Sequence, residues 1–315
     1  MHNSMEENRI LNIHPRWLKE GYVVHSVWTR FCLMGGVLLA TVSACAQGQI
    51  PAQKIKPGTL CGPAIVGAHS VLKPGSMVLV GELHGTNEIE RSFGDLVCQA
   101  ASTGTPVWVG LEIPTDEQPA VDAFLASSGL ASDQQKLLEG SFWNGEFRDG
   151  RSSQAMLDLL DRLRLFQAAG LKIHTVLFVP TVWTEAKAYE VALAKNVLEV
   201  WEKHRHDQFL ILVGSAHGRS MNASLQGDSF PSMAGNLRKA NPGLISLKAA
   251  YADGSAWFCE GDSKENVQCG PHQTRGTDTG HTPFLRLDKA PDPDGYAGTF
   301  YVGAITASSP GAAKQ

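Results

Sequence analysis

The sequence predicts an α/β fold with a largely parallel central sheet flanked by helices and a C-terminal β-hairpin extension. Short apolar runs alternate with longer segments of helical periodicity, which is the pattern of strands joined by crossover helices. Several of these runs are almost continuously apolar, as expected of strands covered on both faces. The composition, with 43% apolar and 18% charged residues, is that of a globular protein. A formal charge of -4 and the lack of a long basic run argue against nucleic acid as a partner.

The first strand is expected at residues 77–82, where four apolar residues precede Gly81 and Glu82. A helix should open at Asn87, because Asn87 and Glu90 have the spacing of a capping box. Apolar residues then recur with helical period at positions 89, 93, 96 and 97. The second strand is expected at residues 106–112, in the apolar run PVWVGLE.

The remaining elements follow the same alternation. Helices are predicted at 116–127 and 133–139, and a longer one starts at residue 152 and ends near Ala169, before Gly170. The third strand (171–179), a long helix (185–204) and the fourth strand (208–214) come next. A helix at 231–239 and a fifth strand at 243–250 precede a hairpin around 256–269 and a last strand near 298–306.

The front of the chain differs from the rest. The apolar run from Phe31 to Ala44 follows Arg30, ends at Cys45 and is shorter than the roughly 20 residues that span a bilayer. Its length and flanks match a secretory signal peptide, and the sequence VSAC resembles a lipobox in which Cys45 is lipidated. The alternative is a buried strand or helix. We therefore expect an exported cell-envelope protein, periplasmic or anchored to the outer membrane, that touches the membrane through its lipid anchor only.

These features divide the chain into four parts. Residues 1–45 are predicted to be a leader with a lipoprotein-type signal peptide, and 46–74 a tether and N-terminal segment. A single α/β domain is expected at 75–306, followed by a disordered tail at 307–315.

Four cysteines lie in the predicted exported part. An even number in an oxidising compartment predicts disulfides. Cys259 and Cys269 flank a polar loop and would close a hairpin tip, which is worth roughly 2–3 kcal/mol in the chain-entropy model. Cys61 and Cys98 form the remaining pair. No Cys-x-x-Cys spacing occurs, which argues against a structural zinc site.

Polar residues follow three of the predicted strands. Glu82 and His84 follow the first, Glu112 ends the second and His217 follows the fourth. Each histidine lies in a Gly-x-x-His-Gly motif. With 32 Gly and 11 His in 315 residues, roughly one Gly-x-x-His is expected by chance, so the number of motifs carries no argument. The argument rests on the position of both motifs directly after apolar strands. The carboxyl ends of parallel strands share one edge of a sheet, where ligands bind. The alternative is that these side chains only make ion pairs or cap carbonyl groups.

Arg151 lies at the start of a predicted helix, where a cation opposes the helix dipole. A specific anionic partner is therefore expected, although a solvated residue is the alternative. Ser215 directly follows Gly214, so the segment is not a Gly-x-Ser-x-Gly nucleophile elbow and predicts no serine nucleophile.

Four segments together resemble the erythromycin esterase, ChaN-like and Tiki superfamily, in particular a bacterial lipoprotein member. They are GELHGTNE at 81–88, Glu112, the Asp-Gly-Arg segment ending at Arg151, and the Gly-Ser-Ala-His segment ending at His217. The resemblance covers about residues 75–250. It implies an α/β sheet with functional residues at the strand ends, His84 and His217 as the two motif histidines, and Glu82 and Glu112 as the neighbouring carboxylates. The stretch YEVALAKN at 189–196 lacks an arginine that many esterase-like members have there, which makes an antibiotic substrate less expected than hydrolysis itself.

The functions of that superfamily diverge. Erythromycin esterases hydrolyse a macrolactone with a histidine base, Tiki-like members are metal-dependent peptide hydrolases, and ChaN-like members are lipoproteins that bind haem. The resemblance therefore leaves open a metal-free site, a site with Mn, Co or Zn held by His84, His217 and Glu112, and a haem site.

The predicted function is that of an exported hydrolase that activates water and cleaves an ester or peptide bond of a small-molecule or peptide substrate. His84 is the expected general base, oriented by Glu82 or Glu112, and His217 or Arg151 would stabilise the oxyanion. Aromatic residues of one loop, Phe142, Trp143 and Phe147, would line the substrate pocket. The alternatives are a haem- or metal-binding lipoprotein without catalysis, with an axial ligand among Tyr189, Tyr251, Tyr296 and Tyr301, or an interaction protein with a vestigial site. The identity of the substrate and the oligomeric state stay open.

Overall fold

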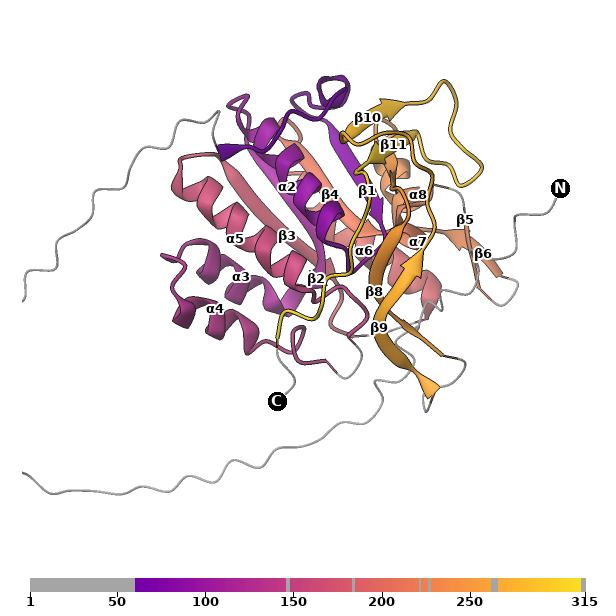
Figure 1. Ribbon diagram of the computed structural model, residues 1–315. Helices are drawn as coiled ribbons and strands as arrows, with labels where there is room; N and C mark the ends of the chain where they lie inside the picture. The colour runs from indigo at the N-terminus through magenta and orange to yellow at the C-terminus, as the bar shows by residue number, and fades with distance from the viewer. Residues whose placement is uncertain are drawn as a thin grey trace, which may run out of the picture.

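A seven-stranded, mostly parallel sheet forms the centre of the molecule (Figure 1). The computed structural model describes residues 60–145, 148–182, 185–220, 222–225, 228–261 and 266–312. The strand order is β10-β11-β7-β1-β4-β2-β3, and only the edge pair β10–β11 is antiparallel. The predicted α/β fold class is confirmed.

The two central strands end level with each other. β1 (Met77–Glu82) runs parallel to β4 (Gln208–Gly214), and Glu82 pairs with Gly214 in the register. All residues of both strands are buried, which explains their continuous apolar sequences. The other strands are β2 (Val107–Pro114), β3 (Ile173–Val179), β7 (Ile245–Ala250), β10 (Phe284–Leu287) and β11 (Gly298–Tyr301).

Helices cover both faces of the sheet (Figure 1). One face is covered by α2 (Asn87–Ala101), α3 (Gln118–Leu125), α4 (Ala131–Leu138) and α5 (Gln154–Ala168), and the other by α6 (Ala186–Trp201) and α8 (Met233–Ala240). Alternate residues of β1 supply the two cores: Val78 and Val80 pack with α2 and α5, and Met77 and Leu79 with α6 and α8. Short helices lie at η2 (Ala68–Ser70), η3 (Thr115–Glu117) and α7 (Ser215–Gly218).

Two small antiparallel pairs complete the fold. They are β5 (Asn222–Leu225) with β6 (Asp228–Pro231), and β8 (Gly254–Glu260) with β9 (Gln268–Thr274). Cys259 faces Cys269 across the second hairpin, and the two form a disulfide. A second disulfide, Cys61–Cys98, ties the segment before the sheet to α2. Both predicted pairings are confirmed.

The boundaries of the domain differ from the prediction. Residues 60–74 belong to it rather than to a tether, because Ile65 and Val71 are buried and Cys61 is bonded to α2. Residues 307–312 are likewise ordered rather than a disordered tail. Ala307 bridges Thr86 and Pro310 bridges Ser153, and such backbone pairs fix the chain.

The start of α2 also differs from the prediction. Asn87 does not form a capping box with Glu90, because its amide donates to the hydroxyl of Thr306 instead. Thr86 is the N-cap, and its hydroxyl donates to the Glu90 carboxylate. This arrangement binds the start of α2 to the C-terminal segment.

Part of the sequence prediction lies outside the described residues. The leader, the signal peptide, Cys45 and the tether up to residue 59 all belong to this part. Within the described residues, none of the helices combines the length and the apolar character needed to cross a bilayer.

Candidate active site

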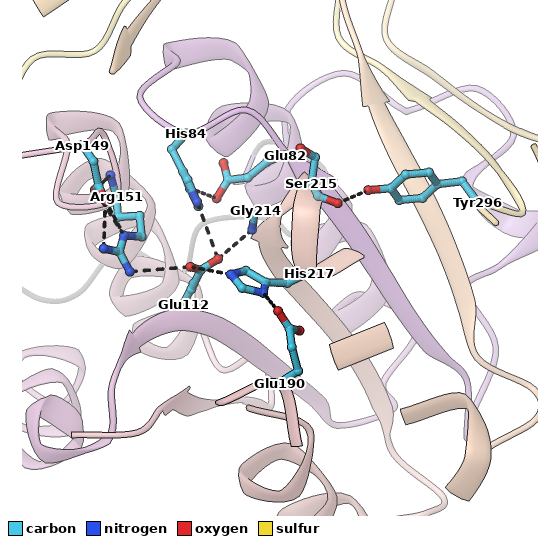
Figure 2. A network of polar contacts seen from close by, with 10 residues as sticks. All are labelled: Glu82, His84, Glu112, Asp149, Arg151, Glu190, Gly214, Ser215, His217 and Tyr296. Carbon is cyan, nitrogen blue, oxygen red and sulfur yellow. Dashed lines mark hydrogen bonds and ion pairs between the residues drawn. The ribbon is translucent and has the colours of Figure 1, made fainter. Parts of the chain in front are cut away.

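Seven side chains with acid, base or cationic groups meet at the carboxyl edge of the sheet (Figure 2). Five of them were predicted: Glu82, His84, Glu112, Arg151 and His217. They come from the ends of β1 and β2, the loop before α5, and α7 after β4. The other two, Glu190 on α6 and Asp149 in the loop before α5, were not predicted as site residues. The structure therefore places residues from distant parts of the sequence in a single cluster.

His84 lies between two carboxylates. Its Nδ1 is 3.1 Å from Oε1 of Glu82, within hydrogen-bond distance, whereas its Nε2 is 3.6 Å from Oε2 of Glu112. The second distance is too long for a hydrogen bond. About 22% of the His84 side chain is exposed, so solvent reaches the ring.

The loop that carries His84 is fixed by its backbone. Gly85 has φ +71°, and its carbonyl oxygen accepts hydrogen bonds from the amides of Trp257 and Ser308. A Cβ at this position would lie 2.2 Å from the carbonyl oxygen of Trp257. Both the left-handed backbone and the close approach therefore require glycine.

Glu112 is the centre of the cluster (Figure 2). Its buried carboxylate accepts a hydrogen bond of 2.7 Å from the Gly214 amide through Oε2. Its Oε1 lies 3.6 Å from Nη1 of Arg151 and 3.9 Å from Nε2 of His217. Burial favours the neutral acid, but the charges of His84, His217 and Arg151 outweigh it and lower the pKa of Glu112. Glu112 is thus a carboxylate shared by three cationic groups.

Arg151 is held in place by Asp149. The guanidinium donates from Nη2 to Oδ2 of Asp149 at 2.8 Å and from Nε to both carboxylate oxygens at 3.1 Å. The charge of Arg151 overcomes the effect of burial and lowers the pKa of Asp149, while Asp149 raises the pKa of Arg151. This forked pair supplies the anionic partner expected for an arginine at a helix start.

His217 is paired with Glu190, one of the two site residues that were not predicted. Its Nδ1 is 2.7 Å from Oε1 of Glu190, and Oε2 of Glu190 accepts from the Met233 amide at 2.5 Å. A signal existed in the sequence: Glu190 lies in helical register with the apolar residues 193, 194 and 197 on the buried face of α6. A carboxylate among buried helix positions is costly unless it is paired, which marks it as functional or structural.

The carboxylates control the protonation of both histidines. Burial alone lowers the pKa of His84, but Glu112 and Glu82 outweigh it and raise that pKa from 6.5 to about 9. Burial likewise lowers the pKa of His217, but Glu190 and Glu112 more than offset this and raise it. Both imidazoles are therefore stabilised in the protonated form.

The buried carboxyl of Glu90, on α2, has its pKa raised by burial and by the charge of Glu82.

The predicted aromatic lining lies largely in the core. Trp143 is 1% exposed and packs edge-on against Phe142, with 5.0 Å between the ring centroids. Phe142 is half-buried against the same core cluster. The structure thus gives Trp143 a packing role, and a substrate-binding role for the pair stays a prediction. Phe147 lies outside the described residues.

The donor set does not fit a divalent metal. Among the described residues, no group of three His, Cys, Asp or Glu side chains is arranged to hold an ion. In particular, Glu112 already accepts from Gly214 and faces the guanidinium of Arg151, whose charge opposes a second cation. The expected ligand set of His84, His217 and Glu112 is therefore not supported.

Two of the tyrosines considered for haem do not fit an exposed axial ligand. Tyr296 and Tyr301 are buried, and their hydroxyl groups donate to the carbonyl oxygens of Ser215 and Gly280. The Tyr296 bond fixes the first residue of α7, the turn that carries His217 (Figure 2). Tyr296 is thus part of the support of the site.

Solved structures share this architecture, whereas no protein-family model and no curated protein matches the sequence. A mutant of the erythromycin esterase EreC in its open conformation matches with a TM-score of 0.55 and 8% identity, over 76% of this chain and 93% of its own. A succinoglycan biosynthesis protein matches with a TM-score of 0.50 and 7% identity, over 75% and 89%. A protein from Bacillus cereus matches with a TM-score of 0.48 and 10% identity, over 76% and 91%. The match with EreC shows that the chain has the fold of the erythromycin esterases.

Proposed function

We propose that this protein is a hydrolase that uses His84 to activate a water molecule without a metal ion and cleaves an ester or peptide bond. The observation that carries the proposal is the geometry around His84. Glu82 fixes Nδ1, while Nε2 faces Glu112 at 3.6 Å without a hydrogen bond. A water between Nε2 and a substrate carbonyl would be within reach of the base.

The space for this water depends on Gly214. A Cβ at position 214 would lie 2.7 Å from Nε2 of His84 and 3.4 Å from Oε2 of Glu112. The absence of a side chain therefore keeps the reacting side of the imidazole open. The Gly214 amide at the same time fixes the Glu112 carboxylate.

The step requires a neutral His84. The imidazole accepts a proton from water as the oxygen attacks the carbonyl carbon, and the cationic Arg151 or His217 stabilises the oxyanion that forms. Because the pKa of His84 is about 9, the neutral base is the minor form at neutral pH, and its fraction rises as the pH approaches 9. Glu82 and Glu112 then stabilise the imidazolium that the reaction produces.

We also propose that the protein is exported and acts on a small-molecule or peptide substrate. Two disulfides are typical of an oxidising compartment. The fold shared with the erythromycin esterase supports an ester as the first bond to test.

The test compares His84→Gln with His206→Gln, a matched change at an exposed histidine in the loop before β4. Hydrolysis of p-nitrophenyl acetate and of a fluorogenic peptide is measured with and without EDTA. We expect one of the two substrates to be cleaved, His84→Gln to lower kcat/KM by about 10²–10⁴-fold, and His206→Gln and EDTA to leave it unchanged. Full activity in His84→Gln, or loss of activity with EDTA, would overturn the proposal.

A further inference from the structure

The Glu190 carboxylate has a fixed partner on each oxygen. Its side chain is about 8% exposed, Oε1 accepts from Nδ1 of His217, and Oε2 accepts from the amide of Met233. Met233 is the first residue of α8, so Glu190 lies at the positive end of that helix dipole. Both carboxylate oxygens of Glu190 are thus held by hydrogen-bond donors.

This arrangement decides how His217 is oriented. To donate to a carboxylate, Nδ1 must carry a proton, and Nε2 then faces Oε1 of Glu112 at 3.9 Å. That distance exceeds a hydrogen bond, so a proton on Nε2 is directed into the site and stays available. The Tyr189 ring, with its centroid 5.9 Å from that of the imidazole, packs beside it.

We propose that His217 is the general acid that protonates the leaving group, and that Glu190 is the positioning residue that holds its ring and its charge. The proposal rests on the proposed function, because it assigns the second half of the same reaction. It also gives the two cationic groups different roles: His217 protonates the leaving group, and Arg151 stabilises the oxyanion.

The proton balance of the reaction is complete with these residues. Water attacks the carbonyl carbon, and its proton moves to Nε2 of His84 while the carbonyl oxygen becomes an oxyanion. The oxyanion then reforms the carbonyl, the bond between carbon and the leaving oxygen or nitrogen breaks, and Nε2 of His217 gives that atom its proton. His84 ends protonated and His217 ends neutral, and exchange with solvent restores both.

The surroundings of the two imidazoles support this division. His217 is faced by Glu190 from α6, Glu112 from β2 and His84 from the loop after β1. The charge on His84 lowers the pKa of His217. When His84 loses its proton, the pKa of His217 therefore rises, and His217 stays protonated more readily. The proposed reaction uses the form in which His84 is neutral and His217 is protonated.

The positioning role is tested by NMR on the full chain labelled with ¹⁵N-histidine, and His217→Gln assigns the signal. We expect both ring nitrogens of His217 to be protonated at pH 7, and Glu190→Gln to lower its pKa by about one unit or more. The Gln side chain can still accept from the Met233 amide. Glu199→Gln, an exposed change on the same helix, should leave the signal unchanged. A His217 that titrates at or below 6.5 in the wild-type protein would overturn the proposal even if Glu190→Gln does not fold.

The acid role is tested by the leaving group. Ethyl acetate needs a proton on its departing oxygen far more than p-nitrophenyl acetate does. We expect Glu190→Gln and His217→Gln to lower the rate on ethyl acetate by about 10²-fold or more, and that on p-nitrophenyl acetate by less than about 10-fold. Equal losses on both esters would overturn the acid role. A wild-type protein that cleaves neither ester, but shows the expected NMR result, would overturn the proposed hydrolysis of esters while the positioning of His217 by Glu190 stands.

Discussion

Replacing Glu112 with Gln should lower the pKa of His84 by removing one of the two carboxylates that raise it most. The upward shift of the wild-type pKa, from 6.5 to about 9, corresponds to about 3 kcal/mol of extra stabilisation of the imidazolium at 1.36 kcal/mol per unit. An opposite charge at this distance contributes about 1–3 units. We therefore expect a pKa between about 6 and 8 in Glu112→Gln, because Glu82 still raises it and burial lowers it.

The change has a kinetic consequence. With a pKa of about 9, roughly 1% of His84 is neutral at pH 7, and with a pKa of 7.5 roughly a quarter would be. The rising limb of kcat/KM against pH should accordingly move to lower pH in Glu112→Gln, whatever the change in its maximum.

The assay is an NMR titration of the histidine ring signals, with His84→Gln to assign the signal. Glu82→Gln should give a shift in the same direction, because Glu82 raises the pKa through both its charge and its hydrogen bond. Glu202→Gln, an exposed change at the end of α6, is the control that should give none. A His84 pKa that stays near 9 in Glu112→Gln would refute the electrostatic reasoning for this site.

Three further outcomes are expected. Folding raises the pKa of His84, so the contribution of this group to stability is complete below pH 6.5 and is lost as the pH rises through about 9. Urea unfolding of the wild-type protein should therefore show a loss of up to about 3 kcal/mol in unfolding free energy over that range. The His84→Gln variant should not show this loss. Gly214→Ala should abolish hydrolysis and cost about 1–3 kcal/mol of stability, because its Cβ would collide with the imidazole, whereas Gly270→Ala meets no atom within 4 Å and should be tolerated. Removing the Cys61–Cys98 disulfide, with its sequence separation of 37, should lower the unfolding free energy by about 4 kcal/mol in the chain-entropy model; no measurable loss would contradict that model here.

The fold was predictable where local sequence determines structure. β4 has the predicted limits, and β1 does too, because each is an apolar run whose length matches a buried strand. β10, with four residues and only one of them fully buried, has no periodicity that would distinguish it from a loop. It forms because β11 offers an edge to pair with.

The site was predictable in part for the same reason. Glu82, Glu112 and His217 are recognisable because they directly follow buried strands that must end at a common edge. Glu190 was missed because its partners, His217 and the amide of Met233, are brought to it by helix packing that no local pattern records. Its place among apolar helix positions was the one available signal.

The tail was mispredicted because its composition is that of a loop. Residues 307–312 are fixed by backbone pairing with Thr86 and Ser153, and backbone hydrogen bonds do not depend on side-chain type. The same holds for the start of α2, where the backbone N–H of Asn87 donates to the carbonyl oxygen of Thr306, far away in the sequence.

The pH dependence of kcat/KM for the hydrolysed substrate tests the central claim, that neutral His84 activates the water, most directly. On p-nitrophenyl acetate, whose leaving group needs little help from the His217 proton, kcat/KM should rise about tenfold per pH unit below pH 9 and level off near the pKa of His84 measured by NMR in the same protein. A rate that does not change between pH 6 and 9, or a rising limb that persists unaltered in His84→Gln, would contradict it.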